Sequence, residues 1–330
     1  MAQLFPGLDL EKLSKEPLTL EVCEGIVAAL QKAIYQDNPF NSFSPLLPAE
    51  KKVNAQGHLM ITEIPYGERY MNSYLDITYP EARQGEKHPT FFFAHGGGFF
   101  GGSKGLGDPM GAGGAPFYEK IVEAGYTLVN VDYVLTPEGH FPDPLVQLNQ
   151  AVSFCMDHAE EYSLDMSRVV IGGSSAGAVL TAQYGCLLAN PSYREILGIH
   201  PAITPEAVRC LIVDDAPFRP EQFNWALQVM MANYLGTLDF ASKGKALNAY
   251  EYFHPSMAPC FFTAGPKDGF PEDMKACHER LFELGVESEL FIPEGNLPHG
   301  YLNLYAKEPE ANECVQKIIA FMDRHAKVVS

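Results

Sequence analysis

From residue 59 onward, short apolar runs alternate along the chain with longer segments of helical periodicity. The runs at 127–131 and 168–172 show no alternation of apolar and polar residues. Strands that are apolar on both faces are buried on both faces, as in a parallel sheet covered by helices. Because crossovers between parallel strands are right-handed, this pattern predicts one doubly wound α/β sheet.

The pattern assigns residue ranges to the individual elements. The predicted strands cover residues 59–64, 71–78, 90–94, 127–133, 168–172, 209–214, 260–265 and 288–293. The predicted helices in this part of the chain cover residues 116–124, 144–162, 176–189, 272–284 and 308–325.

Two segments depart from the alternation. Within residues 18–35, apolar positions recur every four residues, and a loop rich in proline and serine follows at 38–48. This pattern predicts that residues 1–57 form an appended helical arm. Residues 215–255 carry large apolar side chains and no strand signal. They form either a pair of core helices or a cap over a pocket, and the cap is favoured because pockets form at strand ends and are lined by such residues.

Composition and charge narrow the class of protein. The chain has 330 residues, of which 46% are hydrophobic and 19% charged, so it is globular and can build a large core. Lys and Arg number 23 against 41 Asp and Glu, which gives a net charge of −18. Binding to nucleic acid or to an anionic membrane needs clustered positive charge. No such cluster occurs in the sequence, which argues against nucleic acid and an anionic membrane as partners.

Targeting signals and cysteine usage bear on the compartment. The first residues lack the basic region and apolar region of a signal peptide, and no stretch approaches the roughly 18 apolar residues that span a bilayer. The 7 cysteines are widely spaced and form no CxxC pair. We therefore expect a cytoplasmic protein with reduced thiols and no membrane span.

A Gly-x-Ser-x-Gly motif at 173–177 places Ser175 at its centre. An apolar strand precedes the motif and an Ala/Leu-rich helix follows it, which is the context of a sharp strand-to-helix elbow. Small flanking residues let strand and helix approach closely. The serine hydroxyl then projects at a helix N-terminus, where free N–H groups favour developing negative charge. This predicts Ser175 as a nucleophile.

A second motif, His95-Gly96-Gly97-Gly98-Phe99, directly follows the predicted strand 90–94. In acyl transfer, negative charge develops on the former carbonyl oxygen, and glycines let backbone N–H groups approach it without a Cβ in the way. The amides of Gly97, Gly98 and Ala176 are predicted to form this oxyanion hole. The alternative, a nucleotide-binding loop, is weak because neither GxGxxG nor GxxxxGK[ST] fits the glycine spacing.

A serine nucleophile needs a base, and the base needs an acid that holds its tautomer. In hydrolases with this elbow the chain order is serine, then acid, then histidine. His299 is the predicted base because it lies in a turn-rich loop after a predicted strand, from which it can reach the elbow. The other histidines after the elbow lie near the expected cap or on predicted helices: His200, His254, His278 and His325.

The acid is less clearly marked. Asp268 follows the predicted strand 260–265 and stands between the serine and the histidine in chain order, so it is the predicted acid. Asp214 and Asp215, at the end of the preceding strand, and Glu294 remain alternatives. No HxH, HExxH or clustered carboxylate and histidine motif occurs, so no metal is predicted.

Taken together, these motifs resemble the hormone-sensitive-lipase-like esterases with an HGGG motif, within the α/β-hydrolase superfamily. The resemblance covers about residues 70–325. In chain order, it rests on the segment 95–99, Asp132-Tyr133, Phe141-Pro142, the elbow 173–177, Asp268 and His299-Gly300-Tyr301.

The resemblance implies a mostly parallel sheet of about eight strands, flanked by helices and covered by a helical cap. The arm at 1–57 would contribute to that cap, and residues 58–330 would form the catalytic domain with a cap insertion at about 215–255. It further implies a small-molecule ester as substrate, no cofactor and a possible homodimer.

Four features depart from the family pattern. Ser174 stands where the family usually has Asp, Ala178 replaces a second glycine, Gln147 replaces an Asp, and residues 269–273 replace a Leu-x-Asp. None of these changes removes a reacting atom, so the implied mechanism is kept and the substrate preference is open.

The predicted function is a serine carboxylesterase that hydrolyses short-chain esters through an acyl-enzyme. The alternatives are a deacetylase or feruloyl-type esterase, a formamidase, and a non-catalytic ligand-binding protein of the same fold. Retention of His299 argues against the last of these. Five residues are predicted to contact the substrate, although an apolar core explains the aromatic ones as well: His95, Phe99, Phe100, Tyr133 and Trp225.

Overall fold

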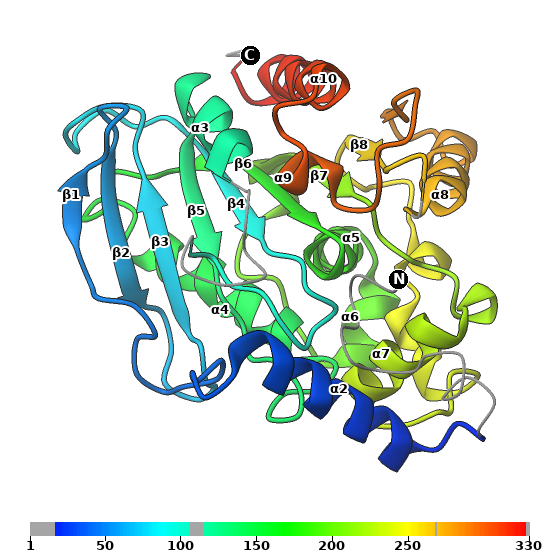
Figure 1. Cartoon of the computed structure of the whole chain (residues 1–330). Coiled ribbons are helices and arrows are strands. Elements are labelled where there is room, and N and C mark those ends of the chain that lie inside the picture. The colour runs from blue at the N-terminus through cyan, green and yellow to red at the C-terminus, as the bar shows by residue number, and fades with distance from the viewer. Residues whose placement is uncertain (1–16, 106–114, 268, 328–330) are drawn as a thin grey trace.

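A computed structural model describes residues 17–105, 115–267 and 269–327 of the chain. Within these residues, nine strands form one sheet in the order β1-β2-β3-β5-β4-β6-β7-β8-β9 (Figure 1). The strands are β1 (Lys51–Val53), β2 (Leu59–Pro65), β3 (Tyr74–Thr78), β4 (Pro89–Ala94), β5 (Thr127–Val131), β6 (Asp165–Ser174), β7 (Val208–Asp214), β8 (Cys260–Thr263) and β9 (Ser288–Phe291).

The strands from β4 to β9 pair in parallel, and β1, β2 and β3 extend one edge of the sheet with antiparallel pairs. The predicted α/β fold with a mostly parallel sheet is therefore confirmed. The additional strand β1 was not predicted, because all three of its residues are exposed and carry no apolar pattern.

Helices cover both faces of the sheet, and others lie beyond the ends of its strands. They are α2 (Leu20–Tyr35), α3 (Ala115–Glu123), α4 (Asp143–Asp157), α5 (Ala176–Ala189), α6 (Pro191–Leu197), α7 (Trp225–Leu235), α8 (Pro271–Glu283), α9 (Tyr301–Leu304) and α10 (Pro309–Ala326). Short 3-10 helices occupy Pro205–Ala207, Pro220–Gln222, Lys243–Leu247 and Ala249–Tyr252. In the described part of the chain, no helix combines the length and the apolar character needed to cross a bilayer.

Strand β4 shows why the sheet is covered on both sides. Phe91 and Phe93 point into the core beneath α3 and α10, whereas Phe92 points into the core shared with α4, α5 and α8. Successive strand residues face opposite sides of a sheet, so three consecutive phenylalanines need an apolar layer on each face. The elbow motif lies where β6 ends, at the rim formed by the carboxyl ends of these parallel strands.

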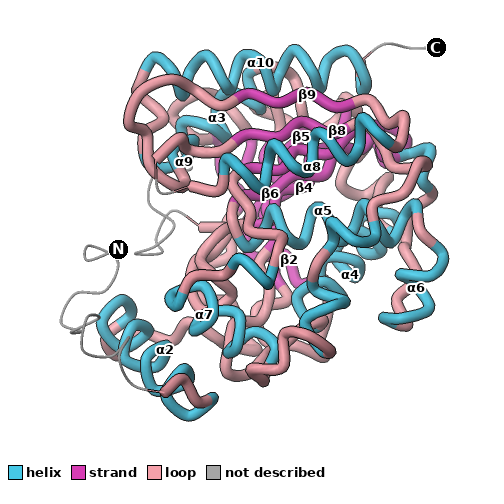
Figure 2. Tube along the Cα trace, turned by 90° about the vertical axis from the view of Figure 1, so that its right-hand side faces the viewer, coloured by secondary structure: helices cyan, strands magenta, loops and turns pink. Residues whose placement is uncertain are grey.

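A helical layer lies beyond this rim. Helix α2 packs against α7 through a small apolar cluster that includes Ile26, Leu30 and Val229 (Figures 1 and 2). The Gln31 side chain of α2 donates hydrogen bonds to the carbonyl oxygens of Phe100 (2.9 Å) and Thr136 (2.6 Å). The arm is therefore bonded to the glycine-rich loop after β4. The division into an arm and a catalytic domain stays a prediction.

Several predicted elements are shorter in the structure, and two of them differ most. The strand predicted at 71–78 begins only at Tyr74, because Asn72 has a positive φ of 57° that breaks the extended backbone. The helix predicted at 144–162 ends at Asp157, and the chain then turns through Ser163, whose φ is 51°. The short helices α6 and α9 were not predicted, since two turns or fewer give no readable periodicity.

Candidate active site

Ser175 occupies the turn between β6 and α5. Its backbone is strained, with φ 54° and ψ −113°, and its N–H donates to the carbonyl oxygen of Asp214 at 2.8 Å. A non-glycine residue in such a conformation costs about 1–3 kcal/mol, and the surrounding packing must compensate for that cost. The predicted elbow geometry is therefore present, and it turns the Ser175 side chain out of the sheet plane at the start of a helix.

Gly177 explains how strand and helix come so close at the elbow. A Cβ on this residue would lie 2.0 Å from the carbonyl oxygen of Ala94, at the end of β4. No side chain larger than hydrogen fits at that separation. The first turn of α5 therefore rests directly on the backbone that leads into the glycine-rich loop.

His299 lies in the loop between β9 and α9. Its Nε2 is 2.9 Å from Oγ of Ser175, although the two residues are 124 positions apart in the chain. The His299 side chain is 31% exposed and Ser175 is half-buried, so a small molecule can reach both. The structure thus brings together the two residues that the sequence singled out as nucleophile and base.

The carboxylate on the other side of the imidazole is that of Asp215. Its Oδ2 lies 3.1 Å from Nδ1 of His299, and the Asp215 side chain is fully buried. Asp215 directly follows β7 and was one of the alternatives left open by the sequence. Asp268, the predicted acid, lies outside the described residues.

Backbone donors hold the Asp215 carboxylate in place. Its oxygens accept hydrogen bonds from the N–H groups of Gly265 (3.1 Å), Phe270 (2.7 Å) and Gly300 (3.1 Å). These donors come from the loop after β8 and from the residue that follows His299. The carboxylate therefore joins three segments at the rim and fixes where His299 stands.

The electrostatics of the site favour a charged imidazole. Burial lowers the pKa of His299, but the hydrogen bond and charge of Asp215, with the charge of Asp214, outweigh it and raise the pKa above its ordinary value. Asp214 is itself buried, and burial together with the neighbouring Asp215 charge raises the pKa of its carboxyl. Two carboxyls at the end of β7 thus act on one imidazole.

The glycine-rich loop lies against the elbow. A Cβ on Gly96 would lie 3.3 Å from Cβ of Ser175, and Gly97 has a positive φ of 117°. A Cβ on Gly97 would meet the carbonyl oxygen of Gly101 at 1.9 Å, so the loop folds back on itself too tightly for any side chain there. Ala176, at the start of α5, is buried. The loop and the start of α5 thus both lie against Ser175, and the oxyanion hole of Gly97, Gly98 and Ala176 stays a prediction.

Four of the residues predicted to contact substrate are buried in packing. Phe99 stacks on Tyr234 with ring centroids 3.5 Å apart, and His95 stacks on Tyr133 at 4.2 Å. Phe100 belongs to the cluster between α2 and α7. Packing alone explains why these four side chains are buried. Substrate contact by them or by the half-buried Trp225 stays a prediction.

Within the described ranges, one group of side chains has the spacing of a metal site. The ligand atoms of Glu81, Glu86 and His88 lie within 4.8 Å of one another. Glu86 is exposed, and His88 Nε2 is 2.6 Å from Glu81 Oε1, so the group is accounted for as a surface ion pair. We assign no metal to it.

Comparisons with known proteins bear on the fold of the chain. The BD-FAE family model matches residues 75–201. Esterase B of Lactobacillus rhamnosis with a tributyrin phosphonate inhibitor is similar in structure, with a TM-score of 0.69 and 18% identity over 97% of each chain. An esterase from Rhizomucor miehei gives a TM-score of 0.68 and 18% identity over 96% of this chain and 95% of that one.

A thermostable esterase from Pseudomonas putida is also similar, with a TM-score of 0.63 and 18% identity over 98% of this chain and 99% of that one. These likenesses establish the α/β-hydrolase fold. Together with the BD-FAE match, they confirm that the chain resembles esterases of this fold, as the motifs predicted.

Proposed function

We propose that this protein is a serine carboxylesterase that hydrolyses short-chain carboxylic esters through an acyl-enzyme. The observation that carries the proposal is the contact of His299 Nε2 with Ser175 Oγ at 2.9 Å, with Asp215 on the opposite nitrogen at 3.1 Å. This arrangement matches a nucleophile, a general base and an orienting acid. The similarity to esterases, one of them solved with a tributyrin phosphonate, supports short-chain esters as the substrate class.

In the first half-reaction, His299 takes the Ser175 proton while Oγ attacks the ester carbonyl carbon. The carbonyl oxygen gains negative charge, which the amides of Gly97, Gly98 and Ala176 stabilise. His299 then donates its proton to the leaving alcohol, and an acyl-serine ester remains. Asp215 holds the imidazole in the tautomer that accepts at Nε2 and stabilises its charged form.

The second half-reaction repeats these steps with water. His299 takes a proton from a water molecule, which attacks the acyl carbon and forms a second tetrahedral intermediate. The Ser175 oxygen leaves, receives the proton back from His299, and the carboxylic acid is released. Every proton passes through one imidazole, so the whole cycle needs no cofactor.

A fluorophosphonate probe tests the proposal against a non-catalytic ligand-binding protein of the same fold. We expect stoichiometric labelling of the folded protein, with the adduct in the peptide that carries Ser175 and no adduct after unfolding. A mere binder does not activate a serine and leaves the probe unreacted. Absence of labelling, or labelling at another serine, would exclude the proposed nucleophile.

A panel of esters then assigns the substrate class. p-Nitrophenyl esters from acetyl to decanoyl, acetylated sugars, a feruloyl ester and an N-formyl amide would be compared by kcat/KM. We expect the highest values for acetyl to butyryl esters. A preference for the feruloyl ester or for the formamide would replace the short-chain assignment and keep the mechanism.

The pKa of His299 predicts the pH dependence. The base must be neutral to accept a proton, so kcat/KM rises as the pH rises through the pKa of His299. Asp214→Asn removes a negative charge that raises this pKa. The acidic limb of the kcat/KM profile for p-nitrophenyl acetate should therefore move to lower pH. Asp239→Asn, at an exposed position, should leave the limb in place, and a limb in Asp214→Asn that stays or moves upward would contradict the prediction.

A further inference from the structure

The glycines of the loop that carries the proposed oxyanion donors have no side chains that could hold its backbone in place. Between β4 and residue 105 it is rich in glycine, and the internal backbone bonds from Phe100 and Gly101 to the Gly97 carbonyl oxygen, at 3.2 and 3.0 Å, make one tight turn. Glycine gives such a turn its shape and leaves it conformationally free. The position of the amides must therefore be fixed by contacts with the rest of the protein.

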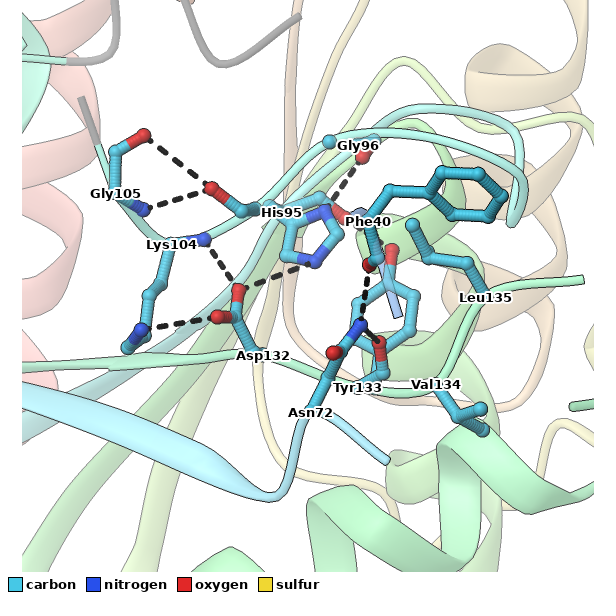
Figure 3. A network of polar contacts seen from close by, with 12 residues as sticks. Phe40, Asn72, His95, Gly96, Lys104, Gly105, Asp132, Tyr133, Val134 and Leu135 are labelled. Atoms are coloured by element: carbon cyan, nitrogen blue, oxygen red, sulfur yellow. Dashed lines mark hydrogen bonds and ion pairs between the residues drawn. The ribbon is translucent and has the colours of Figure 1, made fainter. Parts of the chain in front are cut away.

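Asp132, directly after β5, contacts residues at both ends of this loop. At one end the His95 Nε2 lies 3.6 Å from Asp132 Oδ1, and at the other the Lys104 backbone N–H donates to the same oxygen at 2.5 Å (Figure 3). The Lys104 ammonium lies 3.0 Å from Asp132 Oδ2. One carboxylate thus closes the loop on itself and ties it to the sheet.

Two further carboxylates surround the Lys104 ammonium. Glu63 Oε1 pairs with it at 2.5 Å, and Asp76 Oδ1 lies 3.7 Å away. Glu63 stands at a register shift between β2 and β3 with a positive φ of 57°, and its N–H donates to Asp76 Oδ1 at 2.8 Å. A β-bulge of this kind redirects a side chain, and here it directs Glu63 inward to the lysine.

All four charged side chains are buried, with the Lys104 side chain only 2% exposed. Burial lowers the pKa of Lys104, but the three carboxylates outweigh it and raise the pKa, so the lysine stays charged. Removing charges from water costs about as much as their pairing returns, and apolar side chains often stabilise such a position equally well. We therefore expect the cluster to fix the geometry of the loop more than to raise the free energy of unfolding.

We propose that Lys104, held by Glu63, Asp76 and Asp132, is a positioning residue that sets the Gly97 and Gly98 amides at the distance required by the tetrahedral oxyanion. The proposal rests on the proposed ester hydrolysis. None of the four side chains is assigned a contact with the reacting atoms. Their effect passes through the backbone of residues 95–104, so it should be felt in the transition state and hardly in substrate binding.

Lys104→Met tests this role, because methionine fills a similar volume without charge. We expect kcat for p-nitrophenyl acetate to fall by about 10- to 100-fold with KM nearly unchanged, which is the effect of oxyanion donors that are misplaced but not removed. The affinity for phenylboronic acid, whose tetrahedral adduct on Ser175 places an oxygen in the hole, should fall by a similar factor. Lys275→Met, on the exposed face of α8, is the matched control and should change neither value.

Glu63→Gln and Asp76→Asn extend the series and keep the lysine paired with the remaining carboxylates. Across the folded variants, the loss in kcat/KM should parallel the loss in phenylboronic acid affinity. If Lys104→Met does not fold, these two variants decide the question on their own. Unchanged kcat, a rise in KM alone, or a loss of kcat without loss of boronate affinity would overturn the positioning role. A wild-type protein that neither hydrolyses esters nor reacts with fluorophosphonate would instead refute the proposed function.

Discussion

Ser175→Ala is expected to lower kcat for p-nitrophenyl acetate by about four to six orders of magnitude. The substitution removes the attacking oxygen and leaves the amides of the glycine loop in place. Those amides and substrate binding alone give a residual acceleration of about a thousandfold or more over water. KM should change little, because the hydroxyl does not contribute to holding the ester. Steady-state kinetics on highly purified protein measures both parameters.

The matched control for this variant is Ser256→Ala, at an exposed turn position. It should keep the kinetics of the unmodified protein. Far-ultraviolet circular dichroism and a thermal melt would establish that Ser175→Ala is folded, as expected for the loss of one half-buried oxygen. Turnover by Ser175→Ala within a factor of ten of the unmodified protein would place the nucleophile elsewhere.

The sequence predicts those elements whose burial follows from the local order of apolar and polar residues. Three consecutive phenylalanines in β4 need two apolar faces, and the Gly-x-Ser-x-Gly motif needs a strand before it and a helix after it. Strand β1 has no such pattern, because Lys51, Lys52 and Val53 are all exposed and pair with β2 through their backbone. Edge pairing of this kind depends on tertiary contacts and leaves no trace in side-chain periodicity.

The same distinction applies to the candidate site. Ser175 and His299 lie in local sequence motifs that indicate their roles. The acid can be identified only from the carboxylate that lies next to Nδ1 of His299 in the structure. Strands β7 and β8 are neighbours, so Asp215 and Asp268 both follow strands that end at the same rim. The usable signal for Asp215 was a pair of aspartates closing an apolar strand, Leu211-Ile212-Val213-Asp214-Asp215, with no turn residue between strand and carboxylate.

Lys104 and Glu63 illustrate what sequence patterns leave out altogether. A single lysine in a glycine-rich loop and a glutamate in a strand are each ordinary surface residues by type. The bulge that turns Glu63 inward and the loop that brings Lys104 to it are set by contacts 41 residues apart. Their pairing could be found only once the loop and the strands were placed in space.

Asp215→Asn is expected to lower kcat by about three to four orders of magnitude, the effect of losing the orienting acid in a serine triad. The amide can donate a hydrogen to Nδ1, which stabilises the tautomer that carries its hydrogen on Nε2. That tautomer cannot accept the Ser175 proton. With its nitrogen toward Nδ1, asparagine keeps the size of aspartate and the oxygen that accepts from the Phe270 N–H, whereas the Gly265 and Gly300 N–H groups lose the Oδ2 acceptor. A thermal melt establishes that the variant is folded.

Asp268→Asn is the decisive companion, because Asp268 is the acid that the sequence motifs predict. Nδ1 of a neutral imidazole carries at most one hydrogen, and Asp215 Oδ2 already stands 3.1 Å from it. Asp268→Asn should therefore keep most of the turnover, and a double variant should lose no more than Asp215→Asn alone. If Asp268→Asn instead abolished turnover while Asp215→Asn retained it, the acid would come from the loop after β8, and Asp215 would serve only to join the three backbone segments that it bonds.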